Sequence, residues 1–475
     1  MMTRRAGALL GPLVVLSLLL PACSTTSAPR DAEPTSPVTA TTPPPEPPAE
    51  LAQLSYGVFG NKTEVAAYEA VVAAYNARAT TVEVTLRSWP SSEAMMRAIA
   101  SGTEVADIYQ VTREQLDGVI NARRNVPLFS LLEDRDISYG DNYPLDTIEA
   151  FSRGNDLQCM PYGISPTVMY VNTDLIDFDR MRQLGLPTPE DQLRGWDIEE
   201  FTAAVQFATR PRLKSRGLTI DPTLEGIAPY LYSGGGTIFD NDESPTTLDL
   251  SSGENQETLA TVLALARNPL TTLTDTQLRR ATPLEWFERG RLGVLAAGRT
   301  ITPGLRETPG LSFDVMPMPR IGRTTTTGEV TGVCISPGKS VQRAADFLVH
   351  LISAEGFTPV AEAGYVVPAN TSVARSEVFL QPGLQPANAG VFNASIDSME
   401  LLPLTVGEPI LTASVGRLVA RLFTSTLPPD VALLTAQIDA LSRPILDPTY
   451  EFDPSDVPSP SGTPTLPGAT EPSVP

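Results

Sequence analysis

Apolar positions after residue 50 follow two alternating rhythms, one typical of buried strands and one typical of amphipathic helices. Leu54–Phe59 is an apolar run that ends at Gly60. From Val65 to Tyr75 the apolar residues recur at helical spacing, and Val82–Leu86 then alternates as a strand does. The pattern predicts a strand, a helix and a second strand.

The same order continues along the chain. Ser92 is predicted to cap a helix that ends at Gly102. Ala106–Val111 is predicted to be a third strand, and Thr112 with Gln115 forms a capping box before the next helix. Strands separated by helices imply right-handed crossovers and a parallel sheet covered on both faces.

Ligands of such sheets bind beyond the carboxyl ends of the strands. Side chains that follow each predicted strand are therefore candidates for a binding site. They are Asn61 and Lys62 after the first strand (just beyond Gly60), Trp89 after the second, and Tyr109 near the end of the third.

The N-terminus has the pattern of a secretion signal. Arg4 and Arg5 form a basic start, and the apolar run Ala8–Leu20 is too short for a comfortable membrane span. The tetrapeptide Leu20–Cys23 resembles the lipobox of bacterial lipoproteins, which implies cleavage after residue 22 and two acyl chains on Cys23. Two acyl chains anchor a protein stably in a membrane. The alternative is an ordinary signal peptide with a nearby cysteine.

Proline, serine and threonine dominate the two segments that flank the globular part. Residues 23–50 and 448–475 contain few large apolar residues, so we expect a solvated linker and a disordered tail. At ~3.1 Å per residue, such a linker reaches roughly 80 Å from the bilayer. The intervening residues suffice for two lobes, and no second apolar run has transmembrane length.

The chain carries a net charge of -21. This charge argues against nucleic acid as a partner and against docking on an anionic bilayer. Solubility of an exported protein explains it most simply. It disfavours a strongly anionic ligand and suits a polycation such as a polyamine.

A series of short motifs runs in order through the globular part of the chain. They are Ser101–Tyr109, Pro161–Gly163, Val168–Leu175, Gly185–Pro187, Trp196–Phe201, Tyr232–Gly236 with Asp240, Trp286–Arg291 with Leu295, Gly298–Arg299, Val315–Pro319, Thr331–Ser336, Ala344–Leu348, Ser353–Gly356, Glu362–Tyr365 and Val367–Ala369. Together they resemble the solute-binding proteins of sugar-type ABC transporters, the maltose-binding-protein-like group. Ala106 stands where that family's turn has proline.

The resemblance implies an α/β fold of two lobes, the type II periplasmic-binding-protein fold. Each lobe would have a mainly parallel sheet flanked by helices, with the ligand cleft at the hinge. Residues 51–159 and 333–365 would form lobe one, and residues 160–332 and 366–447 lobe two. Closure of the hinge around a ligand is a standard mode of such proteins.

The function implied is that of a monomeric receptor, lipid-anchored at the outer face of the cytoplasmic membrane. It would bind a carbohydrate, expected to be an oligosaccharide, and deliver it to the membrane permease subunits of an ABC importer. No cofactor, metal or nucleic acid is implied. A polyamine, a glycerol-phosphate compound or a peptide-like solute is the alternative ligand, since only 6% of the residues are aromatic.

Sugar clefts need planar side chains for ring faces and paired polar groups for hydroxyls. Trp286 is the first candidate for stacking, and its alternative role is a helix residue packed in lobe two. The other candidates, each of which could instead be structural, are Asn61, Lys62, Trp89, Asp107, Tyr109, Tyr162, Tyr232, Gly235 and Arg299.

Catalytic motifs are absent from the sequence. The single histidine, His350, lies in a helical pattern, and no Ser-His-Asp set, Walker A loop or Cys-His metal spacing occurs. We therefore expect that the protein is not an enzyme. An extracytoplasmic glycosidase with two carboxylates, or a signalling receptor without an importer, is the alternative of another class.

With Cys23 lipidated, Cys159 and Cys334 remain as a pair in an oxidising compartment. Each lies in a short apolar strand. By resemblance these strands are the first and second crossings between the lobes, which run side by side, and neighbouring strands place Cβ atoms about 4.5–5.5 Å apart. We predict a Cys159–Cys334 disulfide at the lobe-one end of the hinge; the alternative is two buried free thiols.

Overall fold

The structure is a computed structural model that describes residues 51–102, 105–140, 142–154, 156–190, 195–404, 408–424 and 430–459. The predicted signal peptide, the lipidation site at Cys23 and the linker lie outside the described residues. So does the predicted tail from residue 460 onward. The part of the tail before it contains a short 3₁₀ turn, Pro454–Asp456.

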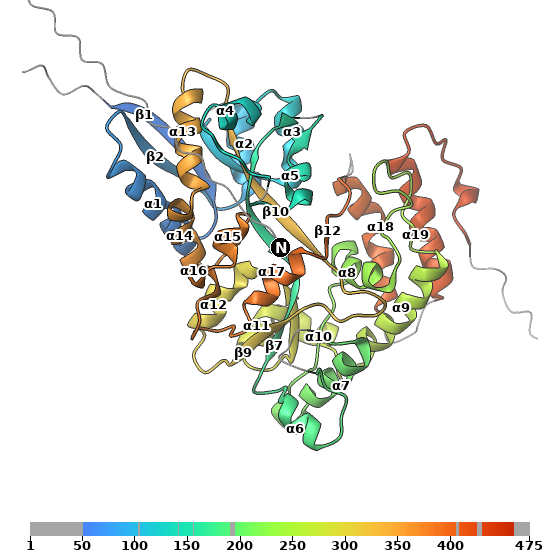
Figure 1. Cartoon of the computed structure of the whole chain (residues 1–475). Coiled ribbons are helices and arrows are strands. Elements are labelled where there is room, and N and C mark those ends of the chain that lie inside the picture. The colour runs from blue at the N-terminus through green and yellow to red at the C-terminus, as the bar shows by residue number, and fades with distance from the viewer. Residues whose placement is uncertain are drawn as a thin grey trace, which may run out of the picture. The chain divides into compact units, whose positions relative to one another are not determined.

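One large sheet runs through the first part of the molecule (Figure 1). Its order is β11-β6-β10-β3-β1-β2, and β12 pairs with β10 outside this path. The strands are β1 (Ala52–Phe59), β2 (Val82–Trp89), β3 (Ile108–Thr112), β6 (Met160–Pro166), β10 (Thr326–Ile335), β11 (Val367–Pro368) and β12 (Met399–Glu400).

The three strands predicted from the apolar rhythm are present and parallel. Strand β1 pairs with β2 from Ala52↔Val82 to Phe59↔Trp89, and with β3 at Tyr56↔Ile108. The other neighbours in this sheet differ, because β10 pairs with both β3 and β6 in the antiparallel sense. The predicted parallel character therefore holds for β1, β2 and β3 and for the short pairing of β12 with β10.

A second sheet has three strands in the order β8-β7-β9, all antiparallel. These are β7 (Val168–Asn172), β8 (Val294–Ala297) and β9 (Phe313–Met316). A small hairpin, β4 (Ser152–Arg153) with β5 (Asp156–Leu157), precedes β6. The predicted α/β class is confirmed, but neither sheet is mainly parallel: the large sheet is mixed and the second is antiparallel.

Helices flank both sheets (Figure 1). Helix α1 packs against α14, and α2 contacts β1, β2 and β3. Those packed with the large sheet are α1 (Lys62–Asn76), α2 (Ser92–Ser101), α3 (Leu116–Asn121), α4 (Phe129–Glu133), α5 (Leu145–Ala150), α13 (Val341–Leu351), α14 (Ala354–Ala363), α15 (Thr371–Ala374) and α16 (Glu377–Leu380).

The remaining helices belong to the part of the chain around the second sheet and to the C-terminal segment. They are α6 (Phe178–Gln183), α7 (Ile198–Ala208), α8 (Leu224–Gly234), α9 (Gly253–Ala266), α10 (Asp275–Leu278), α11 (Pro283–Glu288), α12 (Thr302–Glu307), α17 (Gly390–Ile396), α18 (Glu408–Leu422) and α19 (Val431–Leu446).

Side-chain caps fix where the first helices begin. The N-cap of α2 is Ser91, whose Oγ accepts a hydrogen bond from Ala94 N at 3.2 Å, so the prediction of Ser92 as the cap was wrong by one residue. Gly102 ends this helix in the left-handed conformation, as predicted. The predicted capping box of Thr112 and Gln115 is present and opens a 3₁₀ turn, η1 (Arg113–Gln115), before α3.

Alternation along β7 divides the interior of the second sheet. Val168 and Tyr170 point into the large core that extends from the first sheet, whereas Met169 and Val171 point into a separate cluster with α7. Successive side chains of a strand face opposite sides. Helices α8, α9, α18 and α19 enclose a third cluster. No helix among the described residues is long and apolar enough to cross a membrane.

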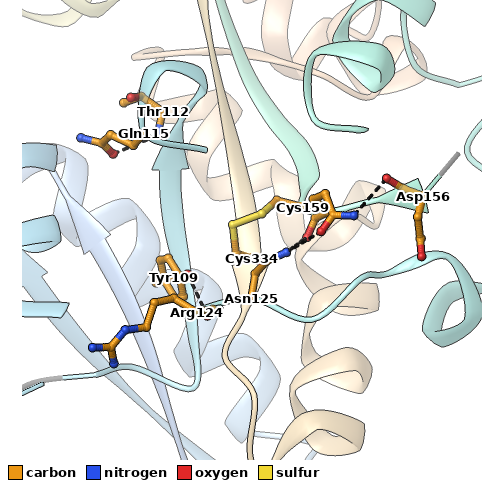
Figure 2. The surroundings of a disulfide bond; sticks show 9 residues. Tyr109, Thr112, Gln115, Arg124, Asn125, Asp156, Cys159 and Cys334 are labelled. Carbon is orange, nitrogen blue, oxygen red and sulfur yellow. Dashed lines mark hydrogen bonds between the residues drawn. A yellow bond between two sulfur atoms is a disulfide. The ribbon is translucent and has the colours of Figure 1, made fainter. Parts of the chain in front are cut away.

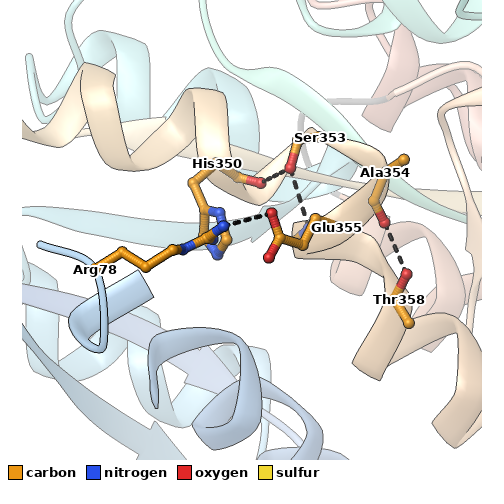
Figure 3. Close-up of polar contacts among 7 residues, drawn as sticks. Arg78, His350, Ser353, Ala354, Glu355 and Thr358 are labelled. Atoms are coloured by element: carbon orange, nitrogen blue, oxygen red, sulfur yellow. Dashed lines mark hydrogen bonds and ion pairs between the residues drawn. The ribbon is translucent and has the colours of Figure 1, made fainter. Parts of the chain in front are cut away.

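The corner between α13 and α14 illustrates how helices pack in the part of the chain predicted to form lobe one (Figure 3). The Ser353 hydroxyl donates to His350 O at 2.7 Å and accepts from Gly356 N at 3.0 Å, which caps α14. The ring of His350 lies 5.3 Å from that of Tyr75. Burial lowers the pKa of His350, as expected for a packed helix residue.

The boundaries given above for the two lobes stay predictions. The described residues, from Leu51 to residue 459, belong to one compact unit.

Candidate functional site

A pocket opens where β3 ends beside the middle of β10. It has a volume of about 340 Å³. Its lining comes from η1, the turn between β6 and β7, the start of α8, the loop after α8, β10, the loop after β12 and α18: Arg113, Glu114, Thr167, Leu224, Glu225, Ile238, Phe239, Thr327, Gly328, Glu329, Leu402, Pro403, Leu404, Leu411 and Thr412.

The pocket exists because β3 is shorter than its neighbour β10. The two strands pair from Ile335↔Ile108 to Thr331↔Thr112, and the chain then turns into η1. From Gly328 to Val330, β10 pairs with β6, with Glu329 opposite Ser165, and β12 pairs with the two preceding residues, Thr326 and Thr327. If β3 continued in register, position 114 would lie opposite Glu329.

Carboxylates dominate the charge of this pocket. Burial, then the charges of Glu114 and Glu93, raise the pKa of Glu329 above its ordinary value. Glu225 lies in the first turn of α8, where the helix dipole favours a negative charge. Arg113 is the cation of the lining, and its Nη1 donates to Leu402 O at 2.6 Å.

A second pocket, of about 450 Å³, adjoins the first, because Arg113 lines both. Its lining is Arg113, Asp146, Glu149, Ala150, Arg153, Met399, Glu400 and Leu401. Two of its charged side chains are paired within the protein: Arg153 with Asp117 at 2.6 Å and Glu400 with Arg323 at 3.1 Å.

None of the ten candidates from the sequence lines either pocket. Asn61 and Lys62 are exposed at the end of β1, where Asn61 Oδ1 accepts from the backbone N–H groups of Thr63 and Glu64. Trp89 is half-buried at the end of β2. These three remain candidates for a ligand contact at the predicted edge of the sheet.

Three further candidates are bonded to or packed on the protein itself. Asp107 Oδ2 accepts from Ser55 N at 2.9 Å and from Ser55 Oγ at 2.7 Å, so it holds β1 against the chain before β3. Tyr109 is fully buried and its hydroxyl donates to Arg124 O at 3.0 Å. Tyr162 stacks on Phe357 with centroids 4.3 Å apart.

The candidates from the later motifs are also buried. Trp286 is 9% exposed, and its Nε1 donates to Gln277 O at 3.2 Å, so its indole packs in the core instead of facing a pocket. Arg299 is 0% exposed and its guanidinium lies 4.1 Å from the ring centroid of Phe379. Tyr232 is buried, and Gly235 ends α8 in the left-handed conformation.

Sequence reasoning missed the charged residues of the pocket, Arg113, Glu114 and Glu329. A signal for the first two was present, because the capping box at Thr112 marks the carboxyl end of the third strand. At this edge the prediction instead included the aromatic side chains Trp89 and Tyr109. Glu329 had no such signal, since its position depends on the pairing of β10 with distant strands.

A model of the family described as bacterial extracellular solute-binding protein matches residues 70–385. The chain belongs to this family. Among curated protein sequences, none matches this solute-binding protein significantly.

Solved structures share its fold. An ABC substrate-binding protein from Listeria monocytogenes in complex with cycloalternan aligns with a TM-score of 0.67 and 17% identity, over 81% of this chain and 97% of that one. The GacH receptor of Streptomyces glaucescens, solved unliganded and with acarbose, aligns with a TM-score of 0.65 and 16% identity, over 84% of this chain and 100% of that one. The cyclic alpha-maltosyl-1,6-maltose binding protein of Arthrobacter globiformis aligns with a TM-score of 0.64 and 16% identity, over 84% of this chain and 99% of that one.

The solute-binding protein contains the predicted disulfide (Figure 2). The Sγ atoms of Cys159 and Cys334 are 1.98 Å apart, and the Cα atoms 4.4 Å. Both side chains are fully buried. Asn125 Nδ2 donates to Gln158 O at 3.2 Å beside the bond, which ties the loop before α4 to the start of β6.

The described ranges contain no group of three or more His, Cys, Asp or Glu side chains that could hold a metal ion. Family and fold are those of binding proteins. What the two pockets offer chemically is a set of carboxylate acceptors, two guanidinium groups and the apolar side chains of Leu224, Phe239 and Leu402.

Proposed function

We propose that this protein is a lipid-anchored extracytoplasmic receptor that binds a carbohydrate, expected to be an oligosaccharide, and delivers it to an ABC importer. The observation that carries the proposal is the pocket between η1, β10 and α8, in a chain of the solute-binding family. It is lined by residues from both predicted lobes and from the predicted crossing strand. Closure around a ligand would join them.

The carbohydrate assignment has two supports. Structures similar in fold include proteins described with cycloalternan, acarbose and cyclic alpha-maltosyl-1,6-maltose. The pocket also combines an apolar wall, including Phe239, with carboxylates and Arg113, and sugars present both apolar ring faces and hydroxyls.

Anchoring through Cys23 is supported by the lipobox-like tetrapeptide before it. Expression in a bacterium fed an alkyne analogue of palmitate would label the protein, and Cys23→Ser would remove the label and release the protein from the membrane fraction. Labelling of the Cys23→Ser variant at the level of the parent protein would disprove this attachment site.

A thermal-shift panel of neutral oligosaccharides, amino-sugar oligomers, spermidine and glycerol 3-phosphate tests the ligand class. Binding to the native state alone adds about 2.7 kcal/mol of stability at a ligand concentration of 100 Kd. At least one carbohydrate should raise the melting temperature. If spermidine or glycerol 3-phosphate raises it and no carbohydrate does, the carbohydrate assignment fails.

Delivery is tested in the source bacterium with the ligand that the panel identifies. Deleting the gene should abolish uptake of that ligand at low concentration, and the intact gene should restore it. Uptake that persists unchanged would separate this receptor from import.

A further inference from the structure

We infer that the ligand carries a positive charge, as an amine-bearing carbohydrate does, and that its amine lies beside Glu329. The inference rests on the proposed function and names the chemical class of ligand for the same pocket. It is carried by the balance of charge along the two adjoining pockets and by the placement of Glu329.

The pocket linings hold more carboxylates than cations. The first pocket contributes Glu114, Glu225 and Glu329, and the second Asp146, Glu149 and Glu400. Against these six stand Arg113, shared by both pockets, and Arg153 of the second.

The two cations are already engaged by the protein. Arg113 donates from Nη1 to Leu402 O at 2.6 Å, and Arg153 pairs with Asp117 at 2.6 Å. Among the carboxylates, Glu400 is paired with Arg323. Within the described part of the chain, no ion pair forms to the other five, which are Glu114, Glu225, Glu329, Asp146 and Glu149.

Glu329 stands where this unbalanced charge is concentrated. It lies on β10 two residues before Thr331, which pairs with Thr112, so its position is beside the turn that holds Glu114. Glu114 and Glu93 both disfavour its ionised form. The charge of Glu114, which also lines the pocket, therefore repels that of Glu329, and Glu93 adds to this repulsion from outside the lining.

The sign of this charge separates the classes of ligand. An anionic ligand such as a glycerol phosphate would add to the repulsion. A neutral sugar can donate hydroxyl hydrogens to the carboxylates but leaves their charge uncompensated. An ammonium group both donates hydrogen bonds and compensates the charge, and charge-assisted hydrogen bonds are roughly twice as strong as neutral ones.

Two tetrasaccharides with one backbone test the inference. The β-1,4-linked tetramer of glucosamine is cationic at pH 6, and the tetramer of N-acetylglucosamine is neutral. By calorimetry at low salt, the amine form should bind at least about tenfold more tightly, the effect of a single attraction in a medium of intermediate dielectric. In 1 M NaCl, where the Debye length is about 3 Å, the preference should shrink.

Glu329→Gln is the variant that localises the effect. It should weaken the amine tetramer about tenfold and leave the affinity for neutral oligosaccharides unchanged. Glu257→Gln, which makes the same change of charge at an exposed position of α9 outside both pockets, is the matched control and should leave both affinities unchanged. Melting curves of each variant verify the fold.

The outcomes distinguish this inference from the proposed function. If the acetylated tetramer or maltotetraose binds as tightly as the amine tetramer, the inference is wrong and the carbohydrate receptor stands. If spermidine binds and no tetrasaccharide does, the carbohydrate function itself is wrong. If no amine binds at all, or Glu257→Gln weakens binding as much as Glu329→Gln, the placement of an amine at Glu329 is disproved.

Discussion

The two ends of strand β10 have opposite surroundings. At one end Val333, Cys334 and Ile335 are fully buried and pair with β3, and a disulfide holds Cys334 to the chain just before β6. At the other end Gly328 and Glu329 keep β6 beside them but have no partner on β3, and they line the pocket.

A single crossing strand thus belongs to the core at one end and to the pocket at the other. The change occurs near Thr331 and Gly332, where the pairing with β6 shifts register. The sequence has the same division, because the apolar run Val333–Ile335 follows a polar stretch that starts at Thr324. The buried end should control stability, and the open end should control binding.

Removing the disulfide has the largest expected effect. The variant Cys159→Ala with Cys334→Ala should lose about 5 kcal/mol of unfolding free energy, the chain-entropy value for a bond spanning 175 residues. Urea denaturation of the double variant and the parent measures the loss. Ligand affinity should not change, since the pocket is at the other end of β10.

Thiol counting on denatured, unreduced protein supplies the control for that experiment. Two free thiols per chain would mean that no bond forms in the expressed protein. A loss of less than about 1 kcal/mol in the double variant would contradict a role of the buried end in stability.

A methyl group at the buried end should have a smaller effect. In Gly332→Ala the new Cβ would lie 2.5 Å from Cε1 of Phe151, whose ring is fully buried. Overpacking of this kind costs about 1–3 kcal/mol. Thermal unfolding measures it, and unchanged ligand affinity is again expected.

Gly118→Ala is the matched control, because no atom lies within 4 Å of the position where its Cβ would be placed. Gly118 lies in α3, where alanine is a better helix former, so this variant should be as stable as the parent or slightly more so. Equal destabilisation of both variants would remove the distinction between the tight and the open position.

Much of the fold could be predicted from the order of apolar and polar residues along the chain. The strands β1, β2 and β3, the end of α2 at Gly102 and the capping box at Thr112 depend on local periodicity and local hydrogen bonds. The partners of β10 depend on contacts between distant segments, so periodicity could not give its antiparallel pairing. The resemblance to the family supplied the crossing strands and the cysteine pair.

The candidate site was harder to predict for a physical reason. Tyr109, Tyr162 and Trp286 were chosen because aromatic rings suit sugar faces, but large apolar rings are also what a core buries. Asp107 and Arg299 are polar, yet their partners Ser55 and Phe379 lie far along the chain and could not be read from spacing. Which polar groups remain unpaired is decided by the tertiary fold.

The open end of β10 should affect stability least, and the size of the effect of Glu329 should depend on pH. Burial, then Glu114 and Glu93, raise the pKa of Glu329 in the folded protein, so the folded state holds this proton at a pH where the unfolded chain has lost it. Stability should therefore fall as pH rises from the ordinary glutamate pKa of 4.5 through the raised value.

In Glu329→Gln this part of the pH dependence disappears. The variant should equal the parent at pH 4 and exceed it at pH 8 by a few tenths of a kcal/mol, because Glu329 is partly open to solvent, which screens its repulsion by Glu114 and Glu93. Urea denaturation at pH 4, 6 and 8 checks this, with Glu257→Gln as the control for net charge. A variant less stable than the parent at pH 8 would show that the Glu329 carboxylate has a stabilising partner, and the contrast between the two ends of the strand would then fail.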